Sequence, residues 1–101
     1  MNKTKFISTL GLAERAKLLL SGEESVLLAI RSQKAFLVLL ASDAGPSTEK
    51  RITDKSAFYG AVLSRALTAE EIAHAIGKPG RRVVCVTDKK MAELLIRTAN
   101  E

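Results

Sequence analysis

Apolar residues along this chain alternate between short continuous runs and helical spacing, and the alternation predicts the order of the elements. Continuous apolar runs at 18–20 and 35–41 and a β-branched run at 83–87 are typical of buried strands, and a shorter run at 61–63 predicts a strand near the sheet edge. Between and around these runs, apolar positions recur every three or four residues. Helices are therefore expected at about 5–16, 21–31 and 48–58, then after residue 68 and after residue 88.

Helices and strands that alternate along the whole chain predict an α/β fold. We expect a three-layer α/β/α sandwich built on one four-stranded mixed sheet, formed by a single domain over residues 1–101. The helix faces expected to point inward carry the following residues: Phe6, Ile7, Leu10 and Ala13; Ile52 with Tyr59 or Phe58; Ile72, Ala75 and Ile76; Met91, Leu94, Leu95 and Thr98.

Helix ends are predicted from capping chemistry. Ser21 with Glu24, and Thr68 with Glu71, have the spacing of a capping box, in which side chain and backbone satisfy each other's amides. The other expected caps are Ser47 and Asp88 at helix starts, and Gly60 and Gly77 at helix ends.

Gly22 lies where the leucine run turns into the second helix. A glycine leaves this turn without a side chain, so another molecule can approach the backbone closely. The following helix start presents amides and a partial positive charge that suit a phosphate or a base edge. Two interpretations stay open: the edge of a binding site, or a capped helix that simply follows a strand.

The charge balance favours a polyanionic partner. Sixteen Lys and Arg residues against 11 Asp and Glu give a net charge of +5, which attracts phosphate whatever the nucleotide sequence. Nucleic acid is favoured over a membrane, although a surplus of charge can also serve solubility alone. No apolar stretch is long enough to span a bilayer. The lone Cys85 excludes an internal disulfide and suits a reducing cytoplasm.

The chain offers few residues for catalysis or for metal or cofactor binding. His74 falls in a predicted helix without a partner acid, and Cys85 falls in an apolar strand, where a thiol behaves as a small hydrophobe. Asp43 follows the central strand, a usual place for a ligand, but a single loop aspartate more often bonds its own backbone. We therefore expect no enzyme, no cofactor and no metal site, and an enzyme using Asp43 and His74 is the least favoured hypothesis.

The most basic loop, 78–82, gathers three cations around two turn-forming residues. It consists of Lys78, Pro79, Gly80, Arg81 and Arg82. Guanidinium groups and backbone amides crowded at one loop suit an RNA backbone or a base edge. A solvated turn is the alternative.

Several blocks of the sequence resemble a known protein family. They are Leu-Gly-Leu-Ala-Glu-Arg-Ala at 10–16, Ser-Gly-Glu-Glu at 21–24, Val-Leu-Leu-Ala-Ile at 26–30, Leu-Val-Leu-Leu-Ala-Ser-Asp-Ala at 37–44, Ile-Thr-Asp-Lys at 52–55 and Ile-Ala-His-Ala-Ile-Gly-Lys at 72–78. In this order they resemble the YlxQ-type bacterial branch of the ribosomal proteins that bind kink-turn RNA (archaeal L-seven-Ae, eukaryotic L-thirty-e). The resemblance covers nearly the whole chain. It implies an α/β/α sandwich and a non-enzymatic RNA binder of ribosomes and small ribonucleoproteins.

The resemblance also implies where RNA would bind. In the family, the turn after the first strand reads the sheared G·A pairs of a kink-turn, and the loop before the last strand packs on a flipped-out nucleotide. The matching positions here are Lys17 before the first strand, Gly22, Glu23, Glu24 and Ser25 at the turn, and Lys78, Pro79, Gly80, Arg81 and Arg82 in the loop. We expect a cytoplasmic monomer that binds structured RNA, ribosomal RNA or a kink-turn-like element.

Three positions depart from the archaeal pattern. Glu24 stands in place of an asparagine that reads base edges, Ser25 in place of a glutamate that does the same, and Leu28 in place of a lysine. An ionised glutamate only accepts hydrogen bonds, whereas asparagine also donates them. The alternative hypothesis is therefore a ribosome-associated protein-interaction subunit, with ribosomal proteins as partners, that has lost standard kink-turn recognition.

Overall fold

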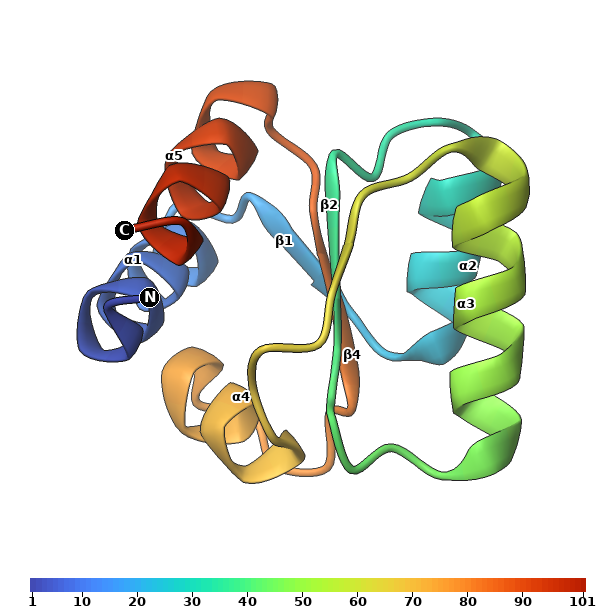
Figure 1. The fold of residues 1–101 in the computed structure, drawn as a ribbon, viewed down its shortest axis with the longest axis horizontal. Helices are drawn as coiled ribbons and strands as arrows, with labels where there is room; N and C mark the ends of the chain where they lie inside the picture. Colours follow the sequence, from blue (N-terminus) through green and yellow to red (C-terminus); the bar gives the residue numbers. More distant parts are fainter.

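A computed structural model describes residues 1–101 and places five helices and four strands in strict alternation (Figure 1). The elements in chain order are α1 (Lys3–Arg15), β1 (Leu19–Ser21), α2 (Glu23–Arg31), β2 (Leu37–Leu40), α3 (Pro46–Tyr59), β3 (Leu63–Ser64), α4 (Ala69–Ile76), β4 (Val83–Val86) and α5 (Lys89–Ala99). The predicted order of elements is confirmed.

The four strands form one mixed sheet in the order β1-β4-β2-β3. β4 lies antiparallel to both β1 and β2, and β3 adds to β2 in parallel. Every residue of β2 and β4 is buried, as expected for central strands covered on both faces. The shorter strands β1 and β3 form the two edges. The four-stranded mixed sheet is therefore as predicted.

Helices cover both faces of the sheet in separate layers. In Figure 1, α1, α4 and α5 lie on one side of the strands, and α2 and α3 lie on the other. Side chains from alternate strand positions point to opposite faces, so Val84 and Val86 enter the first core while Val83 and Cys85 enter the second. Fully burying one Leu, Ile or Val side chain contributes about 1.5 to 3 kcal/mol, which makes these two cores the main source of stability.

Most of the predicted helix ends are confirmed. Thr68 and Glu71 form both bonds of a capping box at the start of α4, and Asp88 accepts a 2.9 Å hydrogen bond from the amide of Met91. The capping bond to the Thr68 amide is the main cause that lowers the pKa of Glu71 below its ordinary value. Gly60 and Gly77 end α3 and α4 in the left-handed conformation.

Two predicted caps are wrong. Ser21 is still paired with Val84 in β1, so α2 begins only at Glu23, with Gly22 as a cap that has no side chain. Ser47 already lies inside α3, because Pro46 occupies the first helical position, where the fixed φ of proline is favourable.

The inward faces of two helices differ from the prediction at one position each. The buried positions of α3, Ile52 and Ser56, set a face that excludes Phe58, which is 79% exposed and packs edge-on against Tyr59. In α5 the buried stripe passes through Leu95 and Thr98, and Leu94 at its border is 36% exposed.

Candidate nucleic-acid interface

The corner between β1 and α2 is an open backbone turn. Gly22 has φ 96° and ψ 148°, a conformation essentially restricted to glycine, and a methyl group built there would contact nothing within 4 Å. The first helical hydrogen bond of α2 runs from the Val26 amide to the Gly22 carbonyl, so the amides of Glu23, Glu24 and Ser25 precede the helical ladder. No side chain caps them. The corner therefore offers hydrogen-bond donors to an approaching partner.

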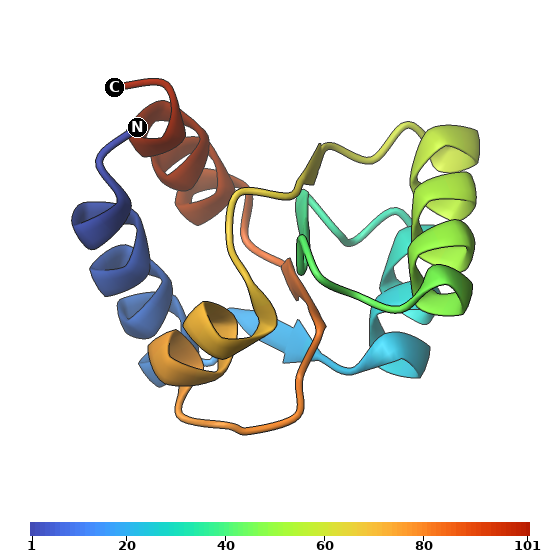
Figure 2. The same cartoon turned by 60° about the horizontal axis from the view of Figure 1, so that its bottom comes forward.

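The basic loop 78–82 lies at the same end of the sheet as this corner. It leaves α4 after Gly77 and enters β4 at Val83, and Gly80 within it has φ 78°. The amide of Gly22 donates a 3.0 Å hydrogen bond to the carbonyl of Val83, and the amide of Ala41 donates a 2.8 Å bond to the carbonyl of Arg82. Figure 2 shows the loop leaving α4 and rising into β4 close to the point where the chain turns from β1 into α2.

The cations of the loop differ in their pairing. Lys78 forms a 3.0 Å ion pair with Glu14 of α1, whereas Arg81 and Arg82 form no ion pair. All five residues of the loop are exposed. Arg81 and Arg82 are therefore the loop cations available to a phosphate.

Lys17 does not lie at the corner. It connects α1 to β1 with a left-handed φ of 62°, and the length of β1 separates it from Gly22. Its side chain is exposed. Of the candidate residues chosen from the sequence, the structure brings together Gly22, Glu23, Glu24 and Ser25 with the loop 78–82, and it leaves Lys17 at the periphery.

The carboxylates of the corner are paired with α3. Glu23 accepts a 2.6 Å hydrogen bond from the Thr48 hydroxyl and forms an ion pair with Arg51. Glu24 lies 3.4 Å from the same guanidinium, and its side chain is 83% exposed. Sequence reasoning missed the role of Arg51. No local sequence pattern marks this residue, and its side chain reaches the corner only because α3 packs on α2.

The structure also shows the surroundings of the remaining candidate residues, Asp43, His74 and Cys85. Asp43 accepts a 2.9 Å hydrogen bond from the amide of Ala69 at the start of α4, and His74 is exposed on the same helix. Burial raises the pKa of the Cys85 thiol to about 11. No group of three or more His, Cys, Asp or Glu side chains could hold a metal ion. None of the helices combines the length and apolar character needed to cross a bilayer.

With this geometry established, comparison with known proteins identifies the family. Residues 4–96 match the ribosomal protein L7Ae/L30e/S12e/Gadd45 family. This chain belongs to that family. The resemblance seen in the sequence is thereby confirmed, and the match extends over nearly all of the two cores described above.

Two curated relatives of this L7Ae-family chain are similar over almost their whole length. Both are named RNA-binding protein YlxQ. The one from Bacillus subtilis (strain 168) is 40% identical over 96 residues, which cover 95% of this chain and 96% of the relative. The one from Enterococcus faecium is 39% identical over 98 residues, covering 93% and 94%.

Solved structures show the same L7Ae-family fold. A protein of unknown function from Bacillus halodurans superposes with a TM-score of 0.90 at 38% identity, covering 96% of this chain and 98% of that one. The Giardia lamblia 15.5kD RNA binding protein gives a TM-score of 0.82 at 12% identity, covering 99% and 89%. At that low identity the second likeness shows the fold alone.

Proposed function

We propose that this protein is a non-enzymatic RNA-binding protein that contacts structured RNA through the Gly22 corner and the basic loop 78–82. The observation that supports it most is the 3.0 Å hydrogen bond from the Gly22 amide to the Val83 carbonyl, because it fixes the open corner beside the loop. Two relatives of similar length are named as RNA-binding proteins, which favours the same activity here.

Each part of the surface has a distinct task in this proposal. The uncapped amides at the start of α2 and the open space over Gly22 accommodate base edges, and the exposed Glu24 carboxylate accepts hydrogen bonds from base amino groups. Arg81 and Arg82 contact phosphates, while Pro79 and Gly80 shape the turn against an unstacked nucleotide. Lys17 adds a weaker phosphate contact at the periphery.

A kink-turn is the RNA class that we propose for this site, because its sheared G·A pairs expose amino groups to an acceptor such as Glu24. The carboxylate cannot donate in return, so we expect weaker discrimination than an asparagine would give. Arg51 limits the repulsion between the two corner carboxylates and the RNA backbone. Ribosomal RNA fragments are the first natural source to test.

The test is a titration of a synthetic kink-turn RNA with the wild-type protein and with an Arg81→Ala, Arg82→Ala double variant. Affinity is measured at several potassium chloride concentrations. We expect the double variant to bind about tenfold or more weakly, and the salt slope to fall by roughly one for each phosphate that the variant no longer neutralises. A second RNA, in which Watson–Crick pairs replace the G·A pairs, measures recognition of the kink-turn itself.

The matched control is Lys89→Ala, Lys90→Ala, which removes the same charge from exposed, unpaired lysines at the start of α5. These lysines follow the opposite end of β4 from the loop. Equal losses in the two double variants would show that net charge alone binds RNA and would reject the site. Equal affinity for the two RNAs would reject kink-turn recognition while leaving RNA binding in place.

A further inference from the structure

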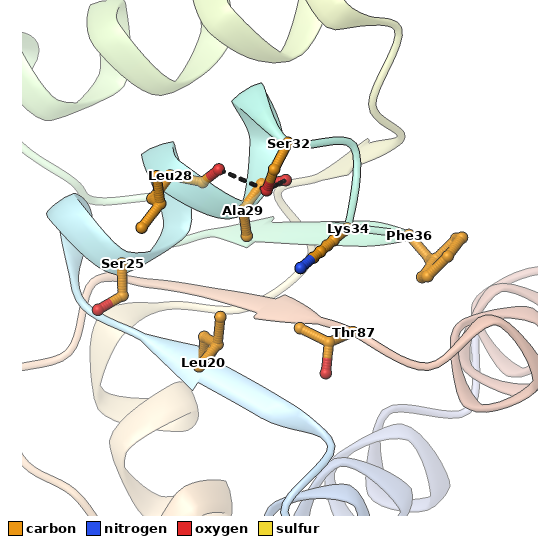
Figure 3. A pocket seen from close by; sticks show the side chains of 8 residues that line it. All are labelled: Leu20, Ser25, Leu28, Ala29, Ser32, Lys34, Phe36 and Thr87. Atoms are coloured by element: carbon orange, nitrogen blue, oxygen red, sulfur yellow. Dashed lines mark hydrogen bonds between the residues drawn. The ribbon is translucent and has the colours of Figure 1, made fainter.

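An apolar groove runs along the edge strand β1, next to the proposed RNA site, with which it shares Ser25. It has a volume of about 550 Å³ and lies between β1, α2 and the segments at 34–36 and 87 (Figure 3). Its walls include Leu20, Leu28 and Phe36, which are 42%, 66% and 39% exposed. It exists because only α2 and α3 cover this face of a four-stranded sheet, so the outer strand β1 is left partly bare.

The backbone beside the groove has an unused hydrogen-bonding edge. β1 pairs only with β4. The Gly22 amide donates to the Val83 carbonyl and the Thr87 amide donates to the Leu18 carbonyl, so the backbone amides and carbonyls of the even-numbered residues in this segment face β4. In an antiparallel ladder the backbone amides and carbonyls of the intervening residues point away from the partner strand. The amides and carbonyls of Leu19 and Ser21 therefore face outward, where an added strand would pair with them.

Lys34 sets the charge of the groove. It is the one charged residue among the lining residues, it forms no ion pair, and Figure 3 shows its ammonium group directed over the groove between Ala29 and Thr87. A carboxylate on the occupant would complement it. The hydroxyls of Ser32 and Thr87 already donate to the Leu28 and Leu18 carbonyls, so they do not compete for that carboxylate.

We propose that this groove binds an extended segment of another protein that adds to β1 as a fifth strand. The segment carries apolar side chains at alternate positions, which enter the groove beside Leu20 and Leu28, and an Asp or Glu that pairs with Lys34. Main-chain hydrogen bonds supply affinity in this mode, and the pockets for alternate side chains supply specificity.

Two other occupants fit less well. RNA would gain a single cation, Lys34, for its phosphates and would meet walls of mainly apolar surface. A second copy in a two-fold contact would place Lys34 against the partner's groove, which contains no carboxylate.

The experiment selects short random peptides, displayed on phage, against the full-length protein in the absence of RNA. We expect the selected peptides to share alternating apolar residues and an acidic residue. Leu28→Glu should lower the affinity for a selected synthetic peptide about tenfold or more, because it places a like charge near the carboxylate of the peptide. Leu12→Glu is the matched control, since this leucine is 53% exposed on α1 and lies outside the groove.

Two further measurements identify the binding mode. Lys34→Glu should abolish binding of the selected peptide, and a peptide with lysine in place of its acidic residue should restore it. Bound peptide should slow hydrogen exchange at the Leu19 and Ser21 amides, which side-chain docking alone would leave unchanged.

Several results would overturn the proposal. The selected peptides could share no sequence pattern, Leu28→Glu could leave peptide affinity unchanged, or the Leu19 and Ser21 amides could stay unprotected. Dimerisation that Leu28→Glu abolishes would also contradict it, as would protection of those amides by a single-stranded RNA in place of the peptide. The peptide assays contain no RNA, so they remain valid whether or not the proposed RNA site fails.

Discussion

Arg51 of α3 forms an ion pair with Glu23, the first residue of α2, and the same guanidinium also reaches Glu24 at 3.4 Å. One cation thus faces two carboxylates at the corner proposed to bind RNA. The shared Arg51 side chain is 46% exposed and lies at the surface, so the pairs contribute only about 0 to 1 kcal/mol to stability. Their larger effect is on the electrostatic potential that an approaching phosphate meets.

Arg51→Met should therefore weaken RNA binding with little change in stability. We expect a loss of about threefold in affinity at low salt, which shrinks as salt is added because surface charges are screened. Titration of the kink-turn RNA at two salt concentrations checks this. Lys50→Met removes the same charge from the neighbouring residue, which pairs with Asp54, and an equal effect of both substitutions would contradict a local role for Arg51.

Gly22→Ala should destabilise the protein although nothing obstructs the new methyl group. The φ of 96° is unfavourable for any L side chain, and the cost is about 1 to 3 kcal/mol. Gly45→Ala is the matched control, because Gly45 also has open space but a φ of −64° that alanine adopts freely. Urea unfolding of both variants measures the difference, and equal stabilities would show that the corner can change its backbone conformation.

The fold could be predicted from the sequence because its signals are local. Continuous apolar runs marked the buried strands β2 and β4, and the Thr68–Glu71 spacing marked the start of α4. Ser21 shows the same spacing with Glu24 but failed as a cap. Its pairing with Val84 depends on the sheet register, which no local pattern records.

The candidate site could be predicted only in part. The Gly22 corner and the basic loop stood out by residue type, whereas their common end of the sheet follows from the antiparallel pairing of β1 with β4, which the sequence pattern did not indicate. The partners of the charges could not be predicted, since Arg51 reaches Glu23 and Lys78 reaches Glu14 only through packing between helices. The apolar groove beside β1 could not be predicted either, because it depends on which part of the sheet the helices leave uncovered.

Thr68→Ala and Ser21→Ala should have different effects although both residues have the same sequence spacing to a glutamate. Thr68 accepts a 3.2 Å hydrogen bond from the Glu71 amide, and its loss should cost about 1 kcal/mol. Ser21 makes no cap, so its substitution should change the free energy of unfolding by no more than about 0.5 kcal/mol. Denaturant unfolding measures both. A large effect of Ser21→Ala would indicate a capping bond that the structure lacks.

Cys85 should make the stability of the protein depend on alkaline pH. Burial raises the pKa of this thiol from 9.0 to about 11 in the folded state, so the folded chain holds the proton more tightly than the unfolded chain. The resulting contribution is fully present below pH 9 and is lost as pH rises to about 11. A shift of that size corresponds to up to about 3 kcal/mol. The measurement is the difference in unfolding free energy between wild type and Cys85→Val across this range, which cancels the contributions of all groups other than the thiol. A constant difference would mean that the thiolate is accommodated inside the core.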